Sequence, residues 1–269
     1  MNANIFRHEF RARLKSVAIW SASMALLIIF FFALFPAFAD QAELMNEMLA
    51  NFPAEMRAAF NLDKMNLATV LGYFAFLFMF VQLCVAIQAS NYGFGLVSIE
   101  EAELTADFLL SKPVSRAEVL TSKLLAALSS LGITDLVIGA SSFIAIIFFR
   151  DQRDYEPRIL LLLLFSIVIF QLFFLSVGLV ISLLVKRVRS VTPYGLGLAF
   201  GAYVLSAFSG ILGDVKLELL TPFKHFDAAA IVTNNAYDMP LVLLNVGITV
   251  IALAASTWLY LHRDIPAVS

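Results

Sequence analysis

Six long apolar runs constrain this chain more than any other feature of its sequence. Each run has about 20 residues or more, enough to cross the hydrocarbon core of a bilayer as an α-helix. Membrane β-strands would alternate apolar and polar residues, and these runs do not. Because backbone groups in lipid must be satisfied within the segment, we predict an all-α, polytopic membrane bundle forming one transmembrane domain over 1–269. The six predicted spans are approximately residues 17–39, 67–89, 124–149, 159–185, 191–213 and 240–261.

Composition agrees with a membrane protein and limits the classes of function. Hydrophobic residues make up 61% of the chain and charged residues only 14%, whereas about a quarter of a soluble domain is charged. The net charge of -2 gives no general attraction for nucleic acid, so we expect no nucleic-acid partner. Cys84 is the only cysteine, which excludes an intrachain disulfide and a cysteine-based metal cluster. We expect no metal site.

Lysine and arginine are distributed unequally between the two sides of the predicted bundle. With a cytoplasmic N-terminus, the cytoplasmic side holds eleven basic residues and the outer side seven. The positive-inside rule therefore predicts that the N- and C-termini are both cytoplasmic. Residues 1–16 are basic and place Phe6, Phe10 and Leu14 at helical spacing. This arm is predicted either to form an interfacial helix on the inner leaflet or to act as a plain basic anchor.

The segment between the second and third spans contains two signals for a helix start. Ser98 stands three residues before Glu101, and Ser115 three before Glu118, which is the spacing of a capping box. We expect a short cytoplasmic helix over about 99–110, which Pro113 separates from the third span. Its acidic and apolar sides suit either a partner's groove or the membrane surface. The candidate partner-binding residues are Ser98, Glu100, Glu101, Glu103, Leu104, Asp107, Phe108, Leu109, Lys112 and Arg116.

The run from Thr105 to Arg116, which ends in LLSKPVSR, resembles the ABC-2 type family of ABC transporter permeases. The resemblance extends to the helix with Lys123 at its start, the basic N-terminal helix, the six spans and the long outer loop before the last span. One departure is that Leu104 precedes Thr105, where family members often have glycine.

The resemblance implies that the segment between spans two and three is a coupling helix. It would fit against a separate ABC ATP-binding subunit, of which two copies are expected. It also implies a second permease half, in a homodimer or heterodimer, and a multi-pass location in a bacterial inner or plasma membrane, in contact with membrane lipid. The cargo of the family ranges over antibiotics, lipids, peptides and ions.

Motifs typical of enzymes are missing from the sequence. There is no GxxxxGK[ST] phosphate-binding loop, no HExxH and no GxSxG, and the three histidines lie far apart. The chain by itself is therefore not expected to be an enzyme or to hold a cofactor. If it belongs to an ABC system, ATP and magnesium would be bound by the partner ATPase.

Asp135 is the only formally charged residue within the six predicted spans. A carboxylate inside the membrane costs roughly 3 kcal/mol or more, so its side chain should face protein or water. On a helical wheel it shares one face with Gly132, Gly139 and Ser142, which predicts contact with another helix. Asp135 would then either line a conduit or contact cargo, or else form an internal hydrogen bond.

Weaker candidates lie in the second and fifth spans. Gln82 and Gln88 are polar members of the second span, and Gly197 and Gly201 form a GxxxG pair in the fifth. Both pairs are candidates for the pathway or for packing, and GxxxG most often reports close packing. The resemblance implies that these two spans face the midline of a dimer. It also implies short re-entrant helices near the exit, within about 214–239.

Three classes of function follow. The leading hypothesis is the membrane-spanning permease subunit of an ATP-driven ABC transporter, an exporter. One alternative is a non-transporting membrane sensor or assembly factor on the same scaffold. Another is an ion-coupled secondary transporter, which the single intramembrane charge and the absence of an evident inverted repeat disfavour.

Overall fold

The computed structural model describes residues 1–59, 62, 65–102, 114–185, 188, 190–212 and 215–262. This part of the chain is helical and contains no strand. Six of its helices are long and apolar enough to cross a membrane, which confirms the all-α class and the number of spans. They are α1 (Ala3–Ala33) with its extension α2 (Phe35–Asp40), α5 (Val70–Ala102), α7 (Arg116–Phe149), α8 (Pro157–Leu184), α9 (Val191–Leu212) and α13 (Met239–His262).

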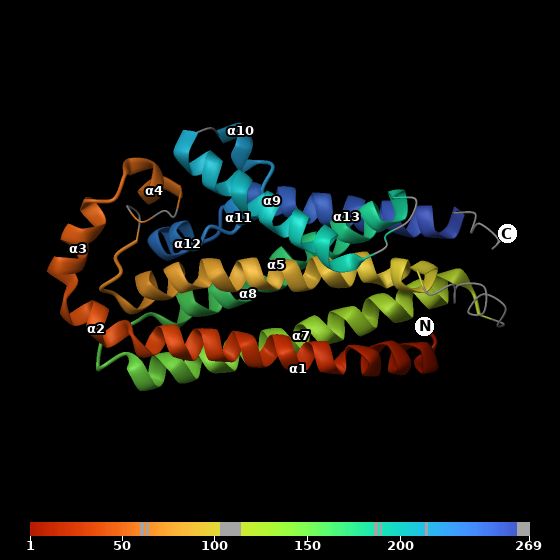
Figure 1. Ribbon diagram of the computed structural model, residues 1–269, viewed down its shortest axis with the longest axis horizontal. Helices are drawn as coiled ribbons and strands as arrows, with labels where there is room; N and C mark the ends of the chain where they lie inside the picture. Colours follow the sequence, from red (N-terminus) through yellow and green to blue (C-terminus); the bar gives the residue numbers. More distant parts are fainter. Residues whose placement is uncertain are drawn as a thin grey trace.

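Shorter helices gather at one end of the bundle, which we call the loop end (Figure 1). There, α3 (Ala42–Ala50) and α4 (Ala54–Ala59) follow α2, while α10 (Val215–Glu218), α11 (Pro222–His225) and α12 (Ala228–Asn234) lie between α9 and α13. At the opposite end, which we call the terminal end, α1 and α7 begin and α5 and α13 end (Figure 1). Because the number of spans is even, the start of α1 and the end of α13 lie at the same end of the bundle.

Helices α5 and α8 form the centre of the bundle. Helix α5 packs against α8 and α9, α1 packs along α7, and α13 packs against α8. The most apolar stretch of α5 is 67% buried and that of α8 is 61% buried, against 17% for α9. The other four spans therefore present much of their surface outward.

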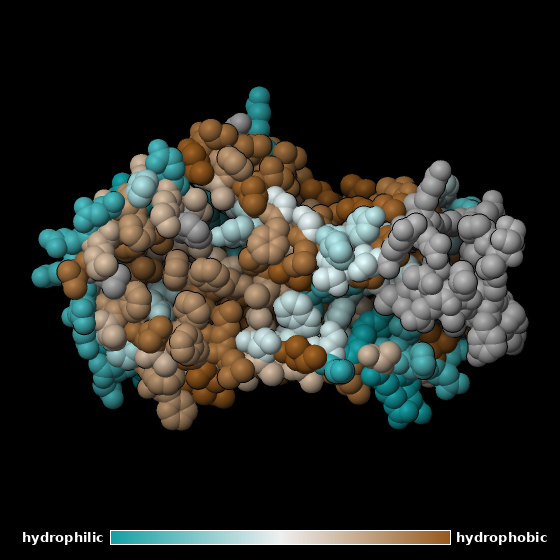
Figure 2. Space-filling model, in the orientation of Figure 1, coloured by the Kyte–Doolittle hydropathy of each residue, from teal (hydrophilic) through white to brown (hydrophobic). Residues whose placement is uncertain are grey.

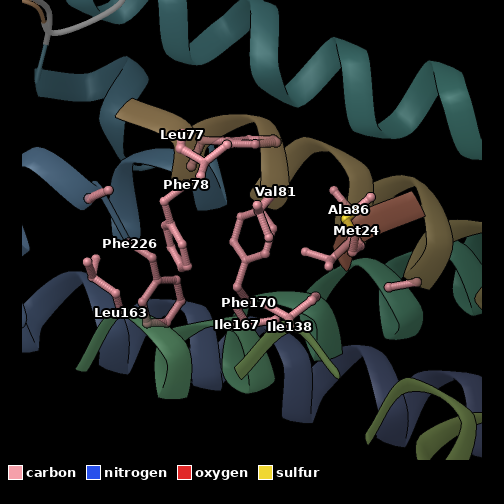
Figure 3. Close-up of a cluster of buried hydrophobic side chains, with 14 of the residues drawn as sticks. Met24, Leu77, Phe78, Val81, Ala86, Ile138, Leu163, Ile167, Phe170 and Phe226 are labelled. Carbon is pink, nitrogen blue, oxygen red and sulfur yellow. The ribbon is translucent and has the colours of Figure 1, made fainter. Parts of the chain in front are cut away.

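The core is filled by aliphatic and aromatic side chains from several helices. Figure 3 shows Leu77, Phe78 and Val81 of α5 together with Phe170 of α8 and Phe226, which precedes α12. The rings of Phe170 and Phe226 meet edge to face, with their centroids 6.3 Å apart, an arrangement that aromatic pairs prefer. The segment between α9 and α13 thus contributes to the core.

Large apolar side chains also cover the outer surface of the spans. Leu136 and Phe148 of α7 are each 76% exposed, and Ile251 of α13 is 70% exposed. Figure 2 shows hydrophobic residues over the middle of the long axis and hydrophilic residues toward both ends. A contiguous apolar surface of this extent is unsuited to water and suited to lipid.

The two predicted capping boxes have different outcomes. The box at Ser115 is confirmed, because its hydroxyl accepts from the Glu118 amide at 3.2 Å and its own amide donates to the Glu118 carboxylate at 3.2 Å. The box at Ser98 is wrong, because α5 continues through this position to Ala102. The buried Ser98 hydroxyl instead donates back to the carbonyl of Phe94, as serines inside helices often do.

The basic N-terminal arm is continuous with the first span. Helix α1 runs unbroken from Ala3 to Ala33 and begins at Asn2, whose side chain accepts from the amides of Asn4 and Ile5. A separate interfacial helix is therefore not confirmed, since no turn divides arm from span. Arg7, Arg11 and Lys15 are exposed on this part of α1, which fits the alternative of a basic anchor.

Candidate functional site

The two flanks of the predicted partner-binding segment, the end of α5 and the start of α7, lie at the terminal end. Glu100 and Glu101 belong to the last turns of α5, and Arg116 is the first residue of α7. The Arg116 guanidinium donates to the carbonyl of Leu261 near the end of α13, at 3.5 Å. The other candidates lie outside the described residues: Glu103, Leu104, Asp107, Phe108, Leu109 and Lys112.

A buried ion network joins the helices on both sides of this segment. The side chain of Lys123 in α7 is 3% exposed, and its Nζ donates to the backbone carbonyl of Leu96 in α5 at 2.7 Å. The same Nζ lies 3.7 Å from Glu9 Oε1 of α1, while Glu9 Oε2 accepts from Arg13 at 2.7 Å. A buried ammonium requires such partners. We call Glu9, Arg13, Leu96 and Lys123 the terminal network.

Sequence reasoning placed Lys123 only as a basic residue at the start of a span and did not select Glu9. The available signal was Glu9 itself, the only acid among the basic residues of the arm, followed at i+4 by Arg13. This spacing forms an ion pair on one helix face. The long-range partner in α7 had no signal in local sequence.

Gln88 takes part in helix contacts one layer deeper in the bundle. Its Nε2 donates to Thr134 Oγ1 of α7 at 3.0 Å and to the Tyr92 hydroxyl at 3.4 Å. The Tyr92 hydroxyl in turn donates to Ser16 Oγ of α1 at 3.2 Å. These contacts connect the same three helices as the terminal network.

Gln82 lies toward the loop end. Its Nε2 donates at 2.8 Å to the carbonyl of Phe226, just before α12, and its side chain is buried. Gln82 thereby holds the segment between α9 and α13 against α5. The two glutamines that the sequence paired as candidates thus lie in different polar contacts.

Asp135 has a partner that the sequence analysis did not identify. Gln171 Nε2 of α8 donates to Asp135 Oδ2 at 2.5 Å, which is an internal hydrogen bond between α7 and α8. The glycines of the same face are loosely packed. A Cβ added at Gly132 would meet no atom within 4 Å, and one at Gly139 would meet only Leu164 Cδ1, at 4.0 Å.

The closest helix approaches occur at glycines outside the predicted motifs. A Cβ at Gly93 of α5 would lie 2.2 Å from the carbonyl oxygen of Leu175 in α8, and one at Gly195 of α9 would lie 2.2 Å from Asn91 Oδ1. Gly197 and Gly201, in contrast, have no atom within 4 Å of an added Cβ. Among the described residues, the GxxxG face of α9 is therefore open.

The segment between α9 and α13 folds as the short helices α10, α11 and α12 and enters the bundle at the loop end. Thr221 Oγ1 donates to the carbonyl of Ala202 in α9 at 2.7 Å. The buried His225 ring contacts the Leu219 carbonyl through Nε2 at 3.2 Å and Asn245 Nδ2 of α13 through Nδ1 at 3.3 Å. Burial lowers the pKa of His225, although its backbone hydrogen bonds oppose this shift.

No group of three or more histidine, cysteine, aspartate or glutamate residues that would hold a metal occurs in the described part of the chain. Its polar side chains instead join helices at the terminal end, at mid-bundle and at the loop end. This fold defines a multi-pass helical membrane protein.

The family model of the ABC-2 family transporter protein matches residues 3–265. The chain therefore belongs to the ABC-2 transporter family, as a membrane-spanning permease subunit of an ABC transporter. Members of this family are transport subunits that are not themselves catalytic, and the family in general implies an ABC ATP-binding partner. No curated protein and no solved structure matches the chain significantly.

Proposed function

We propose that this permease subunit forms the membrane part of an exporter in a bacterial plasma membrane, with its terminal end in the cytoplasm. The observation that carries the proposal is the terminal network, which fixes both flanks of the segment between α5 and α7. Through Lys123, the end of α5 is joined to α7 and to Glu9 of α1. A displacement of the segment would thus move α1, α5 and α7 together.

In this proposal a separate ATP-binding subunit docks on residues 98–116 and binds ATP with magnesium. Phe108 and Leu109 supply apolar anchors for its groove, and Glu103 and Asp107 supply acidic contacts, as their spacing on the predicted helix suggests. ATP then shifts the transporter between two conformations of the permease, because the partner binds ATP with a different affinity in each conformation. The permease would convert that difference into a change of access for cargo.

Copurification of candidate ATPases with the full chain tests the docking site. We expect the double substitution Phe108→Glu and Leu109→Glu to remove the ATPase from the purified complex. The matched control is Leu44→Glu with Met48→Glu, since these α3 side chains are 52% and 53% exposed at the loop end. The proposal is wrong if the ATPase copurifies at wild-type levels with the first variant and stays coupled to the permease.

We also propose that two copies of this chain meet through the open face of α9. A Cβ added at Gly197 or Gly201 would meet no described atom within 4 Å, and Phe200 and Phe208 nearby are 47% and 53% exposed. Small residues on a lipid-facing helix allow a second helix to approach closely. The face belongs to α9, which is the least buried of the six spans.

Cysteine crosslinking in native membranes tests the dimer. In a Cys84→Ser background, Gly201→Cys should give a disulfide-linked dimer on oxidation. The matched control Leu136→Cys places a thiol at a position of α7 that is 76% exposed, and it should stay monomeric. Equal crosslinking at both positions, or none at Gly201→Cys, would contradict a homodimer through this face.

Transport direction requires vesicles of known orientation. With the ATPase subunit present, inside-out membrane vesicles should accumulate cargo when ATP is added outside. Labelled lipid, peptide, antibiotic and ion probes cover the cargo classes of the family. Release rather than accumulation of cargo would indicate an importer, and no ATP-dependent movement of any probe would favour the sensor or assembly factor.

A further inference from the structure

The pair formed by Asp135 and Gln171 leaves two oxygen atoms unsatisfied. Gln171 Nε2 donates to Asp135 Oδ2, but Asp135 Oδ1 and Gln171 Oε1 are buried and have no hydrogen-bond partner among the described residues. Both atoms are acceptors, so neither can satisfy the other while the carboxyl group is ionised. Buried polar atoms are nearly always hydrogen-bonded, so each of these two acceptors calls for a donor.

We propose that Asp135 is a neutral carboxylic acid that binds a proton on Oδ1 and donates it to Gln171 Oε1. A carboxylic acid and a primary amide are both planar, and each has a donor group beside an acceptor oxygen. Two such groups can therefore form a pair of hydrogen bonds in one plane. Oδ2 and Nε2 already form one hydrogen bond, so a proton on Oδ1 that is donated to Oε1 would form a second one between the same two groups. One proton therefore satisfies both oxygens and gives the helices α7 and α8 a two-point contact.

The position of the pair in the bundle favours the neutral form. Asp135 is near the middle of α7 and Gln171 near the middle of α8, so both lie far from the polar ends. A charge at this depth is costly unless it is paired. Among the described residues, no ion pair involves Asp135.

The elements packed against α7 and α8 offer little compensation for a negative charge. Helices α1, α5, α9 and α13 add no Asp, Glu, Lys, Arg or His to the predicted spans, where their titratable groups are Cys84 and tyrosines. From the loop end, α11 contacts α8 and carries Lys224 and His225. Lys224 is paired with Asp227 at 3.6 Å, and His225 contacts Leu219 and Asn245.

A neutral Asp135 makes the contact between α7 and α8 sensitive to protons. If the two helices separate and admit water, the carboxyl group ionises and releases its proton. Protons therefore favour the state in which the helices are paired, because only that state holds the proton. This inference rests on the two unsatisfied oxygens and is independent of export or of the cytoplasmic partner.

Infrared spectroscopy of the full chain in lipid nanodiscs detects the proton directly. At neutral pH we expect a carbonyl stretching band of a protonated carboxyl group, shifted in D2O and absent in Asp135→Asn. The control Asp154→Asn removes an exposed carboxyl group at the loop end and should leave the band unchanged. The absence of a band that depends on Asp135 would overturn the proposal.

Thermal unfolding of the same samples gives a second readout that needs no transport. Asparagine supplies an amide donor where the acid has its hydroxyl, so Asp135→Asn should keep the wild-type unfolding temperature. Asp135→Ala and Gln171→Leu lose both hydrogen bonds and should unfold at lower temperature. If Asp135→Asn is destabilised as much as Asp135→Ala, a donor at this position does not hold the pair together and the proposal fails. The comparison of wild type with Asp135→Asn stands even where the other variants do not fold.

Discussion

Lys123 of α7 donates a hydrogen bond of 2.7 Å from its ammonium group to the backbone carbonyl of Leu96 in α5. The proposed docking segment lies between these two residues in the sequence. This one contact therefore joins the helices that precede and follow the segment. Glu9 of α1 lies 3.7 Å from the same ammonium group and supplies the compensating charge. Lys123 is therefore a positioning residue of the terminal end.

Replacing Lys123 with methionine tests the terminal network. Methionine keeps most of the side-chain volume but removes the charged hydrogen bond, which is worth about 1.5–3 kcal/mol. We expect a loss of that size in the free energy of unfolding, measured by denaturant titration in detergent. Glu9 retains its pair with Arg13, which limits the cost of the lost cation.

Lys15→Met is the matched control, because Lys15 is exposed on the same helix as Glu9 and exposed charges contribute little. It should leave stability within about 0.5 kcal/mol of wild type. In the assembled transporter, Lys123→Met should also weaken the dependence of ATPase activity on the permease. Equal effects of the two substitutions would show that the network has no special role.

The spans were predictable because lipid imposes one length and one composition on every crossing helix. The continuation of α5 beyond residue 89 was not, because Ser90, Asn91 and Ser98 are typical of loops. Tertiary contacts bury this stretch instead: Gly178 of α8 lies against the Ser90 carbonyl, and Gly195 of α9 lies against Asn91. Neither partner helix is visible from the local sequence.

Contacts between helices are not encoded in local sequence, and this also explains why the partners of the glycines and of Asp135 could not be predicted. A GxxxG pair shows that one helix has a smooth face, but the arrangement of the bundle decides which helix it meets. Among the described residues, a Cβ added at Gly197 would meet no atom within 4 Å. Asp135 was predicted to need a partner on energetic grounds. The identity of Gln171, 36 residues away, depends on the register between α7 and α8, which the sequence does not encode locally.

Gly93 is predicted to tolerate no side chain. A Cβ there would lie 2.2 Å from the Leu175 carbonyl oxygen, and backbone atoms of α8 cannot move aside without repacking. We expect Gly93→Ala to lower the free energy of unfolding by about 1–3 kcal/mol, the usual cost of overpacking. Gly247→Ala is the control, since an added Cβ meets nothing within 4 Å, and it should be neutral or stabilising. Equal stability of the two variants, measured by thermal unfolding, would contradict the close contact of α5 and α8.

Gln82 is predicted to stabilise the loop end. In Gln82→Leu the Phe226 carbonyl loses the donor at 2.8 Å, and an unsatisfied buried carbonyl costs about 1–3 kcal/mol. We expect a loss of that size in the free energy of unfolding and faster proteolysis between α9 and α13. Gln41→Leu is the control, because Gln41 is exposed in the turn between α2 and α3. Normal stability with altered cargo transport would instead assign Gln82 to the pathway.

The stability of the loop end should depend on pH through His225. In a neutral ring Nε2 can donate to the Leu219 carbonyl while Nδ1 accepts from the Asn245 amide, and the two contacts are 3.2 and 3.3 Å long. Because burial lowers its pKa in the folded protein, the unfolded chain binds a proton more readily. The free energy of unfolding should therefore fall as pH falls below the unfolded value of about 6.5.

Thermal unfolding of wild type and His225→Gln across this pH range measures the effect. The variant should lose the part of the pH dependence that arises from His225, whatever its stability at neutral pH. His262→Gln serves as the matched control for removing a histidine, because His262 is exposed at the end of α13, and this variant should keep the pH dependence that arises from His225. A wild-type stability that rises on acidification, or a His225→Gln variant with the full wild-type slope, would show that the neutral ring does not hold α11 against α13.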